Sequence, residues 1–357
     1  MKILVILAAS TRGGIDFFQS LLDKHPEISQ LPGEFYVDEF LQKIKKNSSA
    51  EIIANKFIEM HQRYFDSSIS ITERHNSLGP NKNQSYKVDK KLFIKFFLNF
   101  LKKKKINTKN IIIYLHLAYS KASGEDIKKK KLLVIQIHHL FRINYILNIN
   151  FKILCLIRDP LSSHNSYIKN LAFYKTKIPN PWQFYFHINR LFFCVEEIVK
   201  LKKKLIVLRL EDLHLNNKKI MKKFCKVLNL RFKNSLLQST FHNLLWWGDK
   251  VSKKNLNGVN KKFTINIDKN NFFTNDILVI ENYASKFIER YSYEYQLKTK
   301  EKKFIKYLPF KFEILTLKLN LLNLNVKGVF FSIYYYFKRL VLMYIKKREN
   351  IMLPKKF

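Results

Sequence analysis

The sequence predicts an α/β fold with a central, mainly parallel sheet that helices cover on both faces. Short runs rich in Ile, Val and Leu recur along the chain, and segments of helical periodicity separate them. Most residues of these runs are apolar, without regular alternation between apolar and polar positions, which is typical of parallel strands buried on both faces. A chain of 357 residues is long enough for one large domain or two smaller ones.

Four apolar runs are predicted to be strands, and they lie at residues 2–8, 132–137, 152–157 and 205–210. The predicted helices before the second strand lie at residues 17–22, 37–45, 50–64 and 90–104. The first crossover is therefore long, and the polar segment 67–86 within it is expected to be a loop. After the last strand, residues 217–228 are the clearest amphipathic helix, because their apolar side chains repeat on one face.

The chain is strongly basic, with 66 Lys and Arg against 27 Asp and Glu and a formal net charge of +39. Because 47% of its residues are hydrophobic, it is too apolar to be a disordered polycation. Lys, Asn, Ile, Phe and Tyr are abundant, so a biased genome composition explains the lysines as readily as a polyanionic partner does. No RRM, KH, zinc-finger or helix-turn-helix signature accompanies them, and nucleic-acid binding is therefore the less favoured interpretation.

Cys155, Cys194 and Cys225 are far apart in the sequence and have apolar neighbours, which predicts buried thiols and no disulfide framework. The apolar residues 1–9 are about as short as the hydrophobic region of a signal peptide can be. They run into a polar turn at Ser10, so they are interpreted as a buried strand. No uninterrupted apolar stretch reaches the roughly 18 residues of a membrane span, and a cytoplasmic location is expected.

The composition changes near residue 298, where we predict a boundary between a domain of residues 1–297 and a basic, aromatic, helical extension of residues 298–357. The last 60 residues contain 15 Lys and Arg but only 3 Asp and Glu. Residues 326–345 are nearly all apolar, although three basic residues interrupt them. This pattern favours a helix packed on the main domain, and peripheral contact of the extension with an anionic membrane remains the alternative.

The first strand runs into a turn with the sequence Ser10-Thr11-Arg12-Gly13-Gly14-Ile15-Asp16. A pair of glycines after a buried strand lets backbone N–H groups turn inward and cradle a phosphate group. Arg12 adds a planar guanidinium that can bind an anion through two hydrogen bonds. The turn is not a Walker A motif, because it lacks Gly-Lys-Ser/Thr, and an ordinary tight turn would also explain the glycines.

A second candidate anion site follows the strand 152–157. Arg158 stands at the carboxyl end of that strand, where open α/β sheets bind their ligands. Pro160 suits the first turn of a helix, and that helix would bring Ser166 close to its own N-terminus. The alternative is a surface ion pair between Arg158 and Asp159 beside a helix cap.

Three segments together resemble the sulfotransferases that use 3′-phosphoadenosine 5′-phosphosulfate (PAPS). Residues 11–28, which include Leu21-Leu22-Asp23-Lys24-His25-Pro26-Glu27-Ile28, are similar to the family's 5′-phosphosulfate loop and the helix after it. Residues 152–166 look like its 3′-phosphate site, Arg-Asp-Pro…Ser, and residues 208–230 look like its Arg-Tyr-Glu-Asp-Leu segment. The segments occur in the family's order over residues 1–260, and the resemblance is greatest to the bacterial, tyrosylprotein and carbohydrate branches.

This resemblance implies a P-loop-like three-layer α/β/α fold and an enzyme that moves a sulfuryl group from PAPS to an acceptor hydroxyl, on a glycan or glycolipid, without a metal. The donor-binding residues that it implies are Arg12, Gly13, Gly14, Ile15, Asp16, Phe17, Arg158 and Ser166. Glu34 stands where several relatives place the general base, and it would take the proton that the acceptor hydroxyl loses. Arg12 would also act in catalysis, by neutralising charge near the reacting sulfate.

The chain departs from the family pattern at several places. Ile15 and Asp16 replace two hydroxyl residues that usually follow the loop glycine, and Asp16 brings negative charge unless it caps the helix. A lysine common in relatives has no counterpart, so His138 or His139 is the candidate for its role, as a proton donor or phosphate contact. Residues 246–261, which begin with Trp246-Trp247, are expected to cover the nucleotide.

These departures leave other functions open. One alternative is a nucleotide-dependent kinase with a degenerate phosphate loop, although the chain has no Walker lysine and no evident pair of magnesium-binding carboxylates. Another is a non-catalytic basic protein that binds nucleic acid. A third is a sulfotransferase-like chain that binds PAPS without catalysing transfer.

Overall fold

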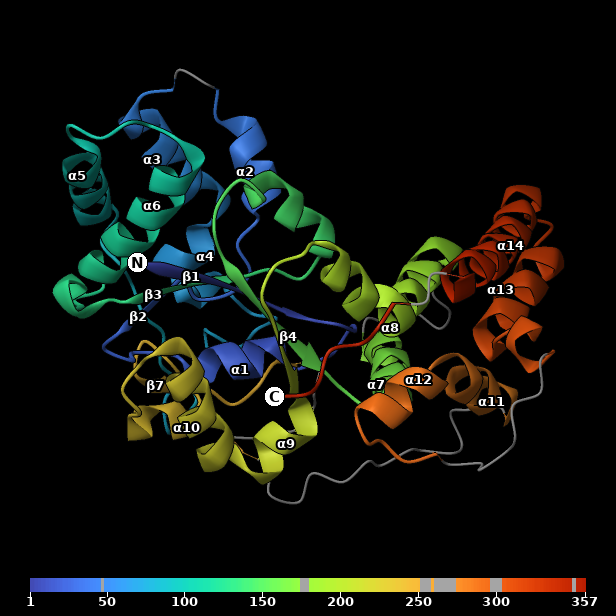
Figure 1. The fold of residues 1–357 in the computed structure, drawn as a ribbon. Helices are drawn as coiled ribbons and strands as arrows, with labels where there is room; N and C mark the ends of the chain where they lie inside the picture. Colours follow the sequence, from blue (N-terminus) through green and yellow to red (C-terminus); the bar gives the residue numbers. More distant parts are fainter. Residues whose placement is uncertain (46–47, 174–179, 251–257, 260–273, 296–303, 349–350) are drawn as a thin grey trace. The chain divides into compact units, whose positions relative to one another are not determined.

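The computed structural model describes residues 1–45, 48–173, 180–250, 258–259, 274–295, 304–348 and 351–357 (Figure 1). Contacts between residues divide the chain into two compact units. Unit 1 consists of Met1–Leu7, Gly14–Leu154 and Glu211–Phe263, and unit 2 consists of Ala8–Gly13, Cys155–Leu210 and Thr264–Phe357. The predicted boundary between residues 297 and 298 falls in the segment 296–303, outside the described residues, and stays a prediction.

The chain forms a mostly parallel five-stranded sheet in the order β2-β3-β1-β4-β5, flanked by helices (Figure 1). The strands are β1 (Lys2–Ala8), β2 (Ile28–Gln30), β3 (Leu132–Gln136), β4 (Lys152–Ile157) and β5 (Leu205–Arg209). β3 pairs in parallel with both β1 and β2, and Ile6 lies opposite Gln136 in the first of these pairs. The predicted α/β class and the four predicted strands are confirmed. β2 is missing from the prediction, because three residues are too few to show a periodic pattern.

Several helices lie between β1 and β3 in unit 1. The helices are α1 (Ile15–Leu21), α2 (Val37–Lys43), α3 (Ala50–Met60), α4 (Gln62–Phe65), α5 (Lys90–Leu101) and α6 (Thr108–Ala122). The helix predicted at residues 50–64 divides into α3 and α4 at His61, whose backbone is not helical. α6 is absent from the prediction, because its buried face includes the polar side chains of His116 and Ser120, which weaken the apolar period.

The rest of unit 1 adds short elements and one long helix. They are the 3₁₀ turns η1 (Ser67–Ile69), η2 (Ile127–Lys129), η3 (Leu140–Ile146) and η4 (Asn234–Leu237), the helix α10 (Asn217–Leu228), and the antiparallel pair β6 (Thr240–Phe241) and β7 (Leu244–Leu245). α9 (Leu210–Leu215) begins at the last residue of a unit 2 segment. The bounds of α10 match the helix predicted at residues 217–228.

An aromatic cluster in unit 1 fixes the backbone beside Glu34. The rings of Phe35, Phe40 and Phe57 are fully buried, and their centroids lie 5.7 to 5.8 Å apart. The backbone N–H of Phe35 donates to the carbonyl oxygen of Gln136 at 2.9 Å. Phe35 is therefore held at the carboxyl end of β3, and Glu34 next to it is held there as well.

Unit 2 is mainly helical after β4. Its helices are α7 (Pro160–Phe173), α8 (Pro181–Lys200), α11 (Thr274–Tyr283), α12 (Ser285–Arg290), α13 (Lys311–Leu322) and α14 (Val326–Arg348), with the 3₁₀ turn η7 (Ile305–Tyr307). The helix predicted at residues 326–345 lies within α14, which pairs with α13 in a helical hairpin (Figure 1). α14 also packs on α8, where the rings of Tyr185 and Tyr335 are 5.7 Å apart. Among the helices in the described ranges, none is both long and apolar enough to cross a membrane.

The three cysteines are free and buried, as the sequence predicts. Burial raises the pKa of the Cys194 and Cys225 thiols to about 11. Both thiols are therefore protonated at neutral pH, and a protonated thiol is a poor nucleophile.

A buried ion pair joins the two helices of the α13–α14 hairpin. Arg339 of α14 is fully buried, and its Nε and Nη2 lie 2.7 and 2.8 Å from the two carboxylate oxygens of Glu313 in α13. Nη2 also donates to the carbonyl oxygen of Leu308 at 3.2 Å, and the guanidinium lies 5.1 Å from the ring centroid of Phe310. The two buried charges therefore balance each other, and most of their hydrogen-bonding groups have partners within the protein.

We expect Arg339→Met to lower the free energy of unfolding by about 3–5 kcal/mol, because it leaves the Glu313 carboxylate buried without its partner. Urea unfolding followed by circular dichroism measures this loss. The double variant Arg339→Met/Glu313→Leu should recover most of the stability, because both buried charges are then gone. A loss below about 1 kcal/mol in the single variant would contradict the role that we give the pair.

Candidate functional site

The loop that follows β1 makes sharp backbone bends at the predicted phosphate-binding residues. Arg12 and Gly14 have positive φ angles of 65° and 81°. At Gly13 an added Cβ would lie 2.5 Å from the Cβ of Ala8, so only glycine fits without a shift of the backbone. Bends of this kind bring successive backbone N–H groups to one side, as an anion-binding turn requires.

Residues of α7 and α8 hold this loop within unit 2. The hydroxyl of Ser163 donates to Ser10 Oγ at 2.7 Å, and it also lies 3.0 Å from the carbonyl oxygen of Thr11. His187 Nδ1 lies 3.3 Å from Thr11 Oγ1, and Arg190 donates to the carbonyl oxygen of Ala8 at 2.8 Å. The loop is therefore fixed by side chains from two helices that follow it by more than 140 residues.

Arg158 contacts the same loop. Its Nη1 donates to the carbonyl oxygen of Arg12 at 3.0 Å, and both residues are half-buried. The structure thus brings together the two arginines that the sequence motifs single out, 146 residues apart. Ser166 is half-buried in the second turn of α7, and the serine of α7 that bonds to the loop is Ser163.

The side chains of two other implied donor-binding residues pack inside unit 1. Ile15 is buried, with an exposed fraction of 6%. The ring of Phe17 stacks on the ring of His214, with centroids 4.5 Å apart and planes inclined by 8°. Ile15 can therefore offer a donor only its backbone groups, whereas the Phe17 ring is half-buried.

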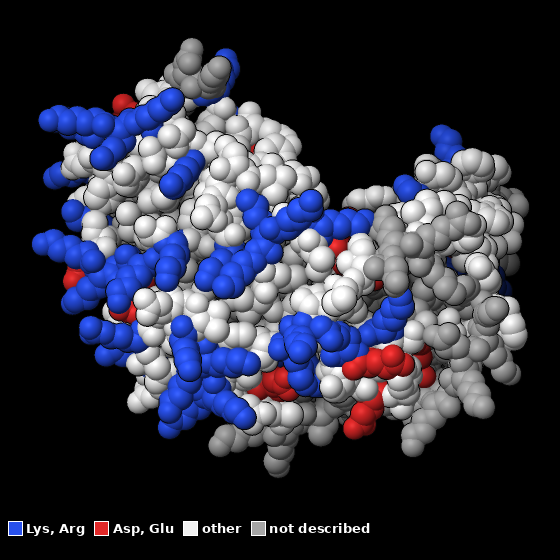
Figure 2. Space-filling model, viewed as in Figure 1, with Lys and Arg blue, Asp and Glu red and all other residues white. Residues whose placement is uncertain are grey.

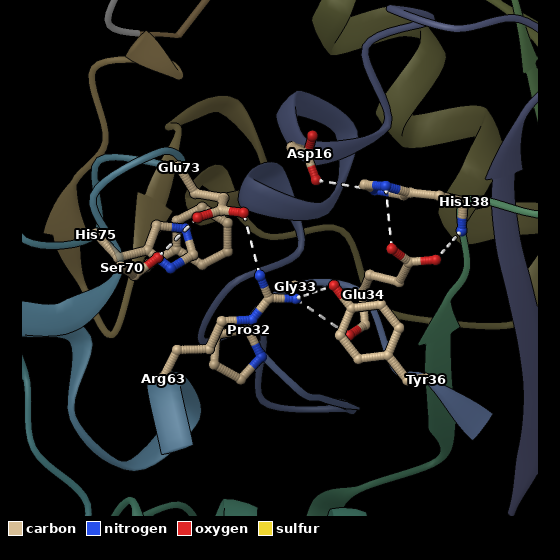
Figure 3. Close-up of a pocket in the computed structure, with 11 residues that line it drawn as sticks. Asp16, Pro32, Gly33, Glu34, Tyr36, Arg63, Ser70, Glu73, His75 and His138 are labelled. Carbon is tan, nitrogen blue, oxygen red and sulfur yellow. Dashed lines mark hydrogen bonds and ion pairs between the residues drawn. The ribbon is translucent and has the colours of Figure 1, made fainter. Parts of the chain in front are cut away.

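A pocket in unit 1 collects Asp16, Glu34 and His138, three residues that the sequence analysis singles out (Figure 3). Its empty volume is about 450 Å³, which includes the open mouth. The other residues that line it are Pro32, Gly33, Tyr36, Arg63, Ser70, Glu73, His75 and Phe241. The lining is polar, with carboxylates, a guanidinium, imidazoles and two aromatic rings.

Glu34 lies at the base of a network of hydrogen bonds and charges. Its side chain is only 7% exposed. The backbone N–H of His138 donates to Glu34 Oε1 at 2.8 Å, and His138 Nδ1 lies 3.2 Å from Oε2 (Figure 3). Arg142 Nε is 3.2 Å from Oε1. The carboxylate is thus held in one orientation and has a cation beside it.

Arg142 of η3 compensates several acids at once. Its side chain is 6% exposed, and it forms ion pairs with Asp38 and Glu39 of α2 as well as with Glu34. Its guanidinium also lies 4.7 Å from the ring centroid of Tyr36. The sequence analysis misses Arg142, because the acids lie more than 100 residues earlier in the chain.

His138 is the more exposed partner of Glu34, with a side-chain exposed fraction of 37%. The amide Nε2 of Gln136 lies 2.6 Å from Asp16 Oδ1 and 2.9 Å from His138 Nε2. An amide nitrogen can only donate, so neutral His138 accepts at Nε2 and carries its proton on Nδ1, facing Glu34. Asp16 Oδ1 is also 3.5 Å from His138 Nε2.

The structure bears on two alternatives that the sequence leaves open. The N-cap of α1 is Gly14, with no side-chain cap, and Asp16 reaches Gln136 instead of capping the helix. Of the two histidines, His138 lines the pocket, whereas the ring of His139 stacks with Phe141 at 5.5 Å.

The far wall of the pocket is polar. Arg63 pairs with Glu73 at 3.1 Å, and Glu73 accepts a hydrogen bond from Ser70 at 3.0 Å. His75 lies against the ring of Phe241, and burial lowers its pKa to about 3, so it is neutral at physiological pH. Among the described residues, no group of three or more His, Cys, Asp or Glu side chains is placed to hold a metal ion.

The tryptophans of the predicted covering segment pack within unit 1. The indole N–H of Trp246 donates to the carbonyl oxygen of Glu73 at 2.6 Å, and that of Trp247 donates to Gly79 at 2.6 Å. Trp246 is 4% exposed, so its ring has no free face for stacking on adenine. Residues 251–257 and 260–261 of the segment lie outside the described residues.

No protein-family model and no curated protein matches the chain. Among solved structures, it is similar to a sulfotransferase domain from the curacin biosynthetic pathway, with 15% identity, a TM-score of 0.41, and coverage of 85% of this chain and 95% of that one. It is also similar to a sulfotransferase domain from the olefin synthase of Synechococcus PCC 7002, with 16% identity, a TM-score of 0.38, and coverage of 74% and 84%.

Proposed function

We propose that the chain is a sulfotransferase that moves a sulfuryl group from PAPS to a hydroxyl group of a glycan or glycolipid. The observation that carries the proposal is the pairing of buried Glu34 with half-exposed His138 in one polar pocket. A carboxylate that orients a neutral imidazole is a common arrangement for removing a proton from a hydroxyl group.

The donor has two anionic ends, and each would meet one arginine. Arg12 and the backbone amides of Gly13 and Gly14 would bind the 5′-phosphosulfate, and Arg158 with Ser166 would bind the 3′-phosphate. Support comes from the loop geometry and from the hydrogen bond that Arg158 Nη1 donates to the backbone carbonyl oxygen of Arg12, which brings the Arg158 guanidinium to the loop that carries Arg12. Positively charged groups that are already in position stabilise the transition state, because they need not reorganise as negative charge develops on the donor.

In the transfer step, the acceptor oxygen forms a bond to sulfur while the bond between sulfur and the 5′-phosphate oxygen breaks. The product 3′-phosphoadenosine 5′-phosphate (PAP) keeps the electron pair of that bond. We assign the acceptor proton to His138 Nε2, rather than to Glu34 as the resemblance implies. There it displaces the amide of Gln136, and Nδ1–H stays with Glu34. Glu34 and Asp16 then face the imidazolium from opposite ring nitrogens and stabilise its charge.

The pocket lining supports a sugar hydroxyl as the acceptor. Tyr36 is a half-buried aromatic ring suited to C–H groups, and the half-buried Glu73 carboxylate can accept hydrogen bonds from hydroxyl groups. The charge of Arg63 is already balanced by Glu73, so this wall of the pocket suits a neutral acceptor with several hydroxyl groups.

Calorimetric titration of the full chain tests the donor. We expect PAP to bind with a dissociation constant in the micromolar range, and ATP and 5′-AMP to bind at least about tenfold more weakly. Incubation with ³⁵S-labelled PAPS and fractions of glycans and glycolipids should label one fraction. Displacement of PAP by ATP would favour the kinase, and tight, salt-dependent RNA binding without PAP binding would favour the nucleic-acid-binding protein.

A further inference from the structure

The outer face of α14 carries a continuous apolar stripe. Its members recur every three or four residues and therefore lie on one side of the helix. They are Val326, Phe330, Ile333, Phe337, Val341 and Tyr344. Their exposed fractions run from 43% to 79%, so six large apolar side chains in a row face away from the hairpin.

The opposite face of α14 is the one that the protein buries. Ser332, Arg339 and Met343 are between 0% and 8% exposed. Arg339 is held by Glu313, and Tyr336 donates to the carbonyl oxygen of Tyr307 at 2.7 Å. These contacts hold the buried face of α14 against the rest of unit 2. The apolar stripe on the opposite side of the helix therefore points outward.

The turn between α13 and α14 is also apolar and exposed. Leu321, Leu322 and Leu324 are 55%, 69% and 88% exposed. Leu324 has a φ of 49°, a left-handed conformation that favours Gly or Asn over leucine. In a turn that only water surrounds, Asn or Gly would be more stable than leucine at this position. The exposed leucine therefore indicates that the turn contacts an apolar environment.

The charge of the hairpin is almost entirely positive. Residues 311–348 contain eight Lys and Arg and one acid, Glu313, which already holds Arg339. Lys327 and Lys338 lie beside the apolar stripe, eleven residues apart along the helix. The helix ends with Lys346-Lys347-Arg348. In Figure 2 the described surface over α13 and α14 is largely white with a few blue side chains.

We propose that the α13–α14 hairpin docks on the surface of a membrane that contains anionic lipids. The apolar stripe and the leucine turn would enter the boundary between headgroups and acyl chains, while the lysines meet the lipid charges. α14 has 23 residues and is about 34 Å long, yet its basic residues make it unsuitable for crossing the bilayer, so it would lie in the plane of the interface. Charge complementarity favours an anionic lipid surface over a second copy of this equally basic chain.

Cosedimentation of the full chain with vesicles tests this inference without any use of PAPS. We expect binding to vesicles with about 30% phosphatidylserine in phosphatidylcholine, and at least about tenfold weaker binding to phosphatidylcholine alone or in about 0.5 M NaCl. Phe330→Ser/Phe337→Ser should weaken binding by about tenfold or more, because two rings no longer enter the lipid. Ile52→Ser/Ile69→Ser, which removes two large apolar side chains from unit 1 that are 56% and 53% exposed, should leave binding unchanged.

Circular dichroism and PAP titration of each variant show whether it is folded, so a loss of vesicle binding is distinct from a failure of the proposed sulfotransferase. Absence of vesicle binding by the unaltered chain would overturn the inference. So would equal losses in the two double variants, or light scattering that shows a dimer whose formation is abolished by Phe330→Ser/Phe337→Ser.

Discussion

Glu34→Gln is expected to lower kcat for sulfuryl transfer by about 10²–10⁴-fold, while the affinity for PAP changes by less than about threefold. The glutamine side chain has nearly the same shape, but it cannot balance the positive charge that His138 acquires with the acceptor proton. The initial rate of ³⁵S transfer to the labelled acceptor fraction measures kcat, and calorimetry measures PAP binding. A matching loss in His138→Ala, with little further loss in the double variant, is expected of two groups that act as one unit.

Glu39→Gln is the matched control for this experiment. Glu39 lies 3.4 Å from the same Arg142 but is half-exposed and does not line the pocket. Its replacement should change kcat by no more than about twofold. If Glu34→Gln kept full activity, or if it lost PAP binding to the same extent as activity, the carboxylate would have no role in proton removal.

Arg158→Ala is expected to weaken PAP binding by about 100-fold and 5′-AMP binding by less than about threefold. A charge-assisted bidentate contact contributes about 3 kcal/mol, and 5′-AMP lacks the 3′-phosphate with which Arg158 would make it. Arg12→Gly should instead weaken both ligands, because both carry a 5′-phosphate. Glycine is chosen at position 12 since the backbone φ there is 65°.

Measuring the affinity of both variants for PAP and 5′-AMP distinguishes direct binding of the 3′-phosphate by Arg158 from a structural role of that residue. Arg158 also donates to the carbonyl oxygen of Arg12, so a purely structural role would reduce the affinity for PAP and 5′-AMP equally. Arg158→Lys keeps the charge without the fork and should give an intermediate loss for PAP. Equal losses for both ligands in Arg158→Ala would contradict a 3′-phosphate site at this residue.

Local sequence patterns predicted the elements whose residues repeat regularly. The strands 2–8 and 152–157 are apolar after their first residue, and α10 has one apolar face, so each was found within a residue of its bounds. α6 and β2 were missed, because buried polar side chains interrupt the period of α6 and β2 is too short to have one. The same contrast holds for the site. Arg12 and Arg158 were found because each follows a recognisable strand.

By itself, the sequence determined the α/β class, the strands that carry the two arginine motifs, and the resemblance that names a donor. Only the tertiary structure decided which side chains work together. Arg142 reaches three acids that precede it by more than 100 residues, Gln136 joins Asp16 to His138, and His187 and Arg190 hold the loop from α8. The physical reason is that periodicity and capping act over one or two turns of chain, whereas pairing of charges and hydrogen bonds depends on distances in space.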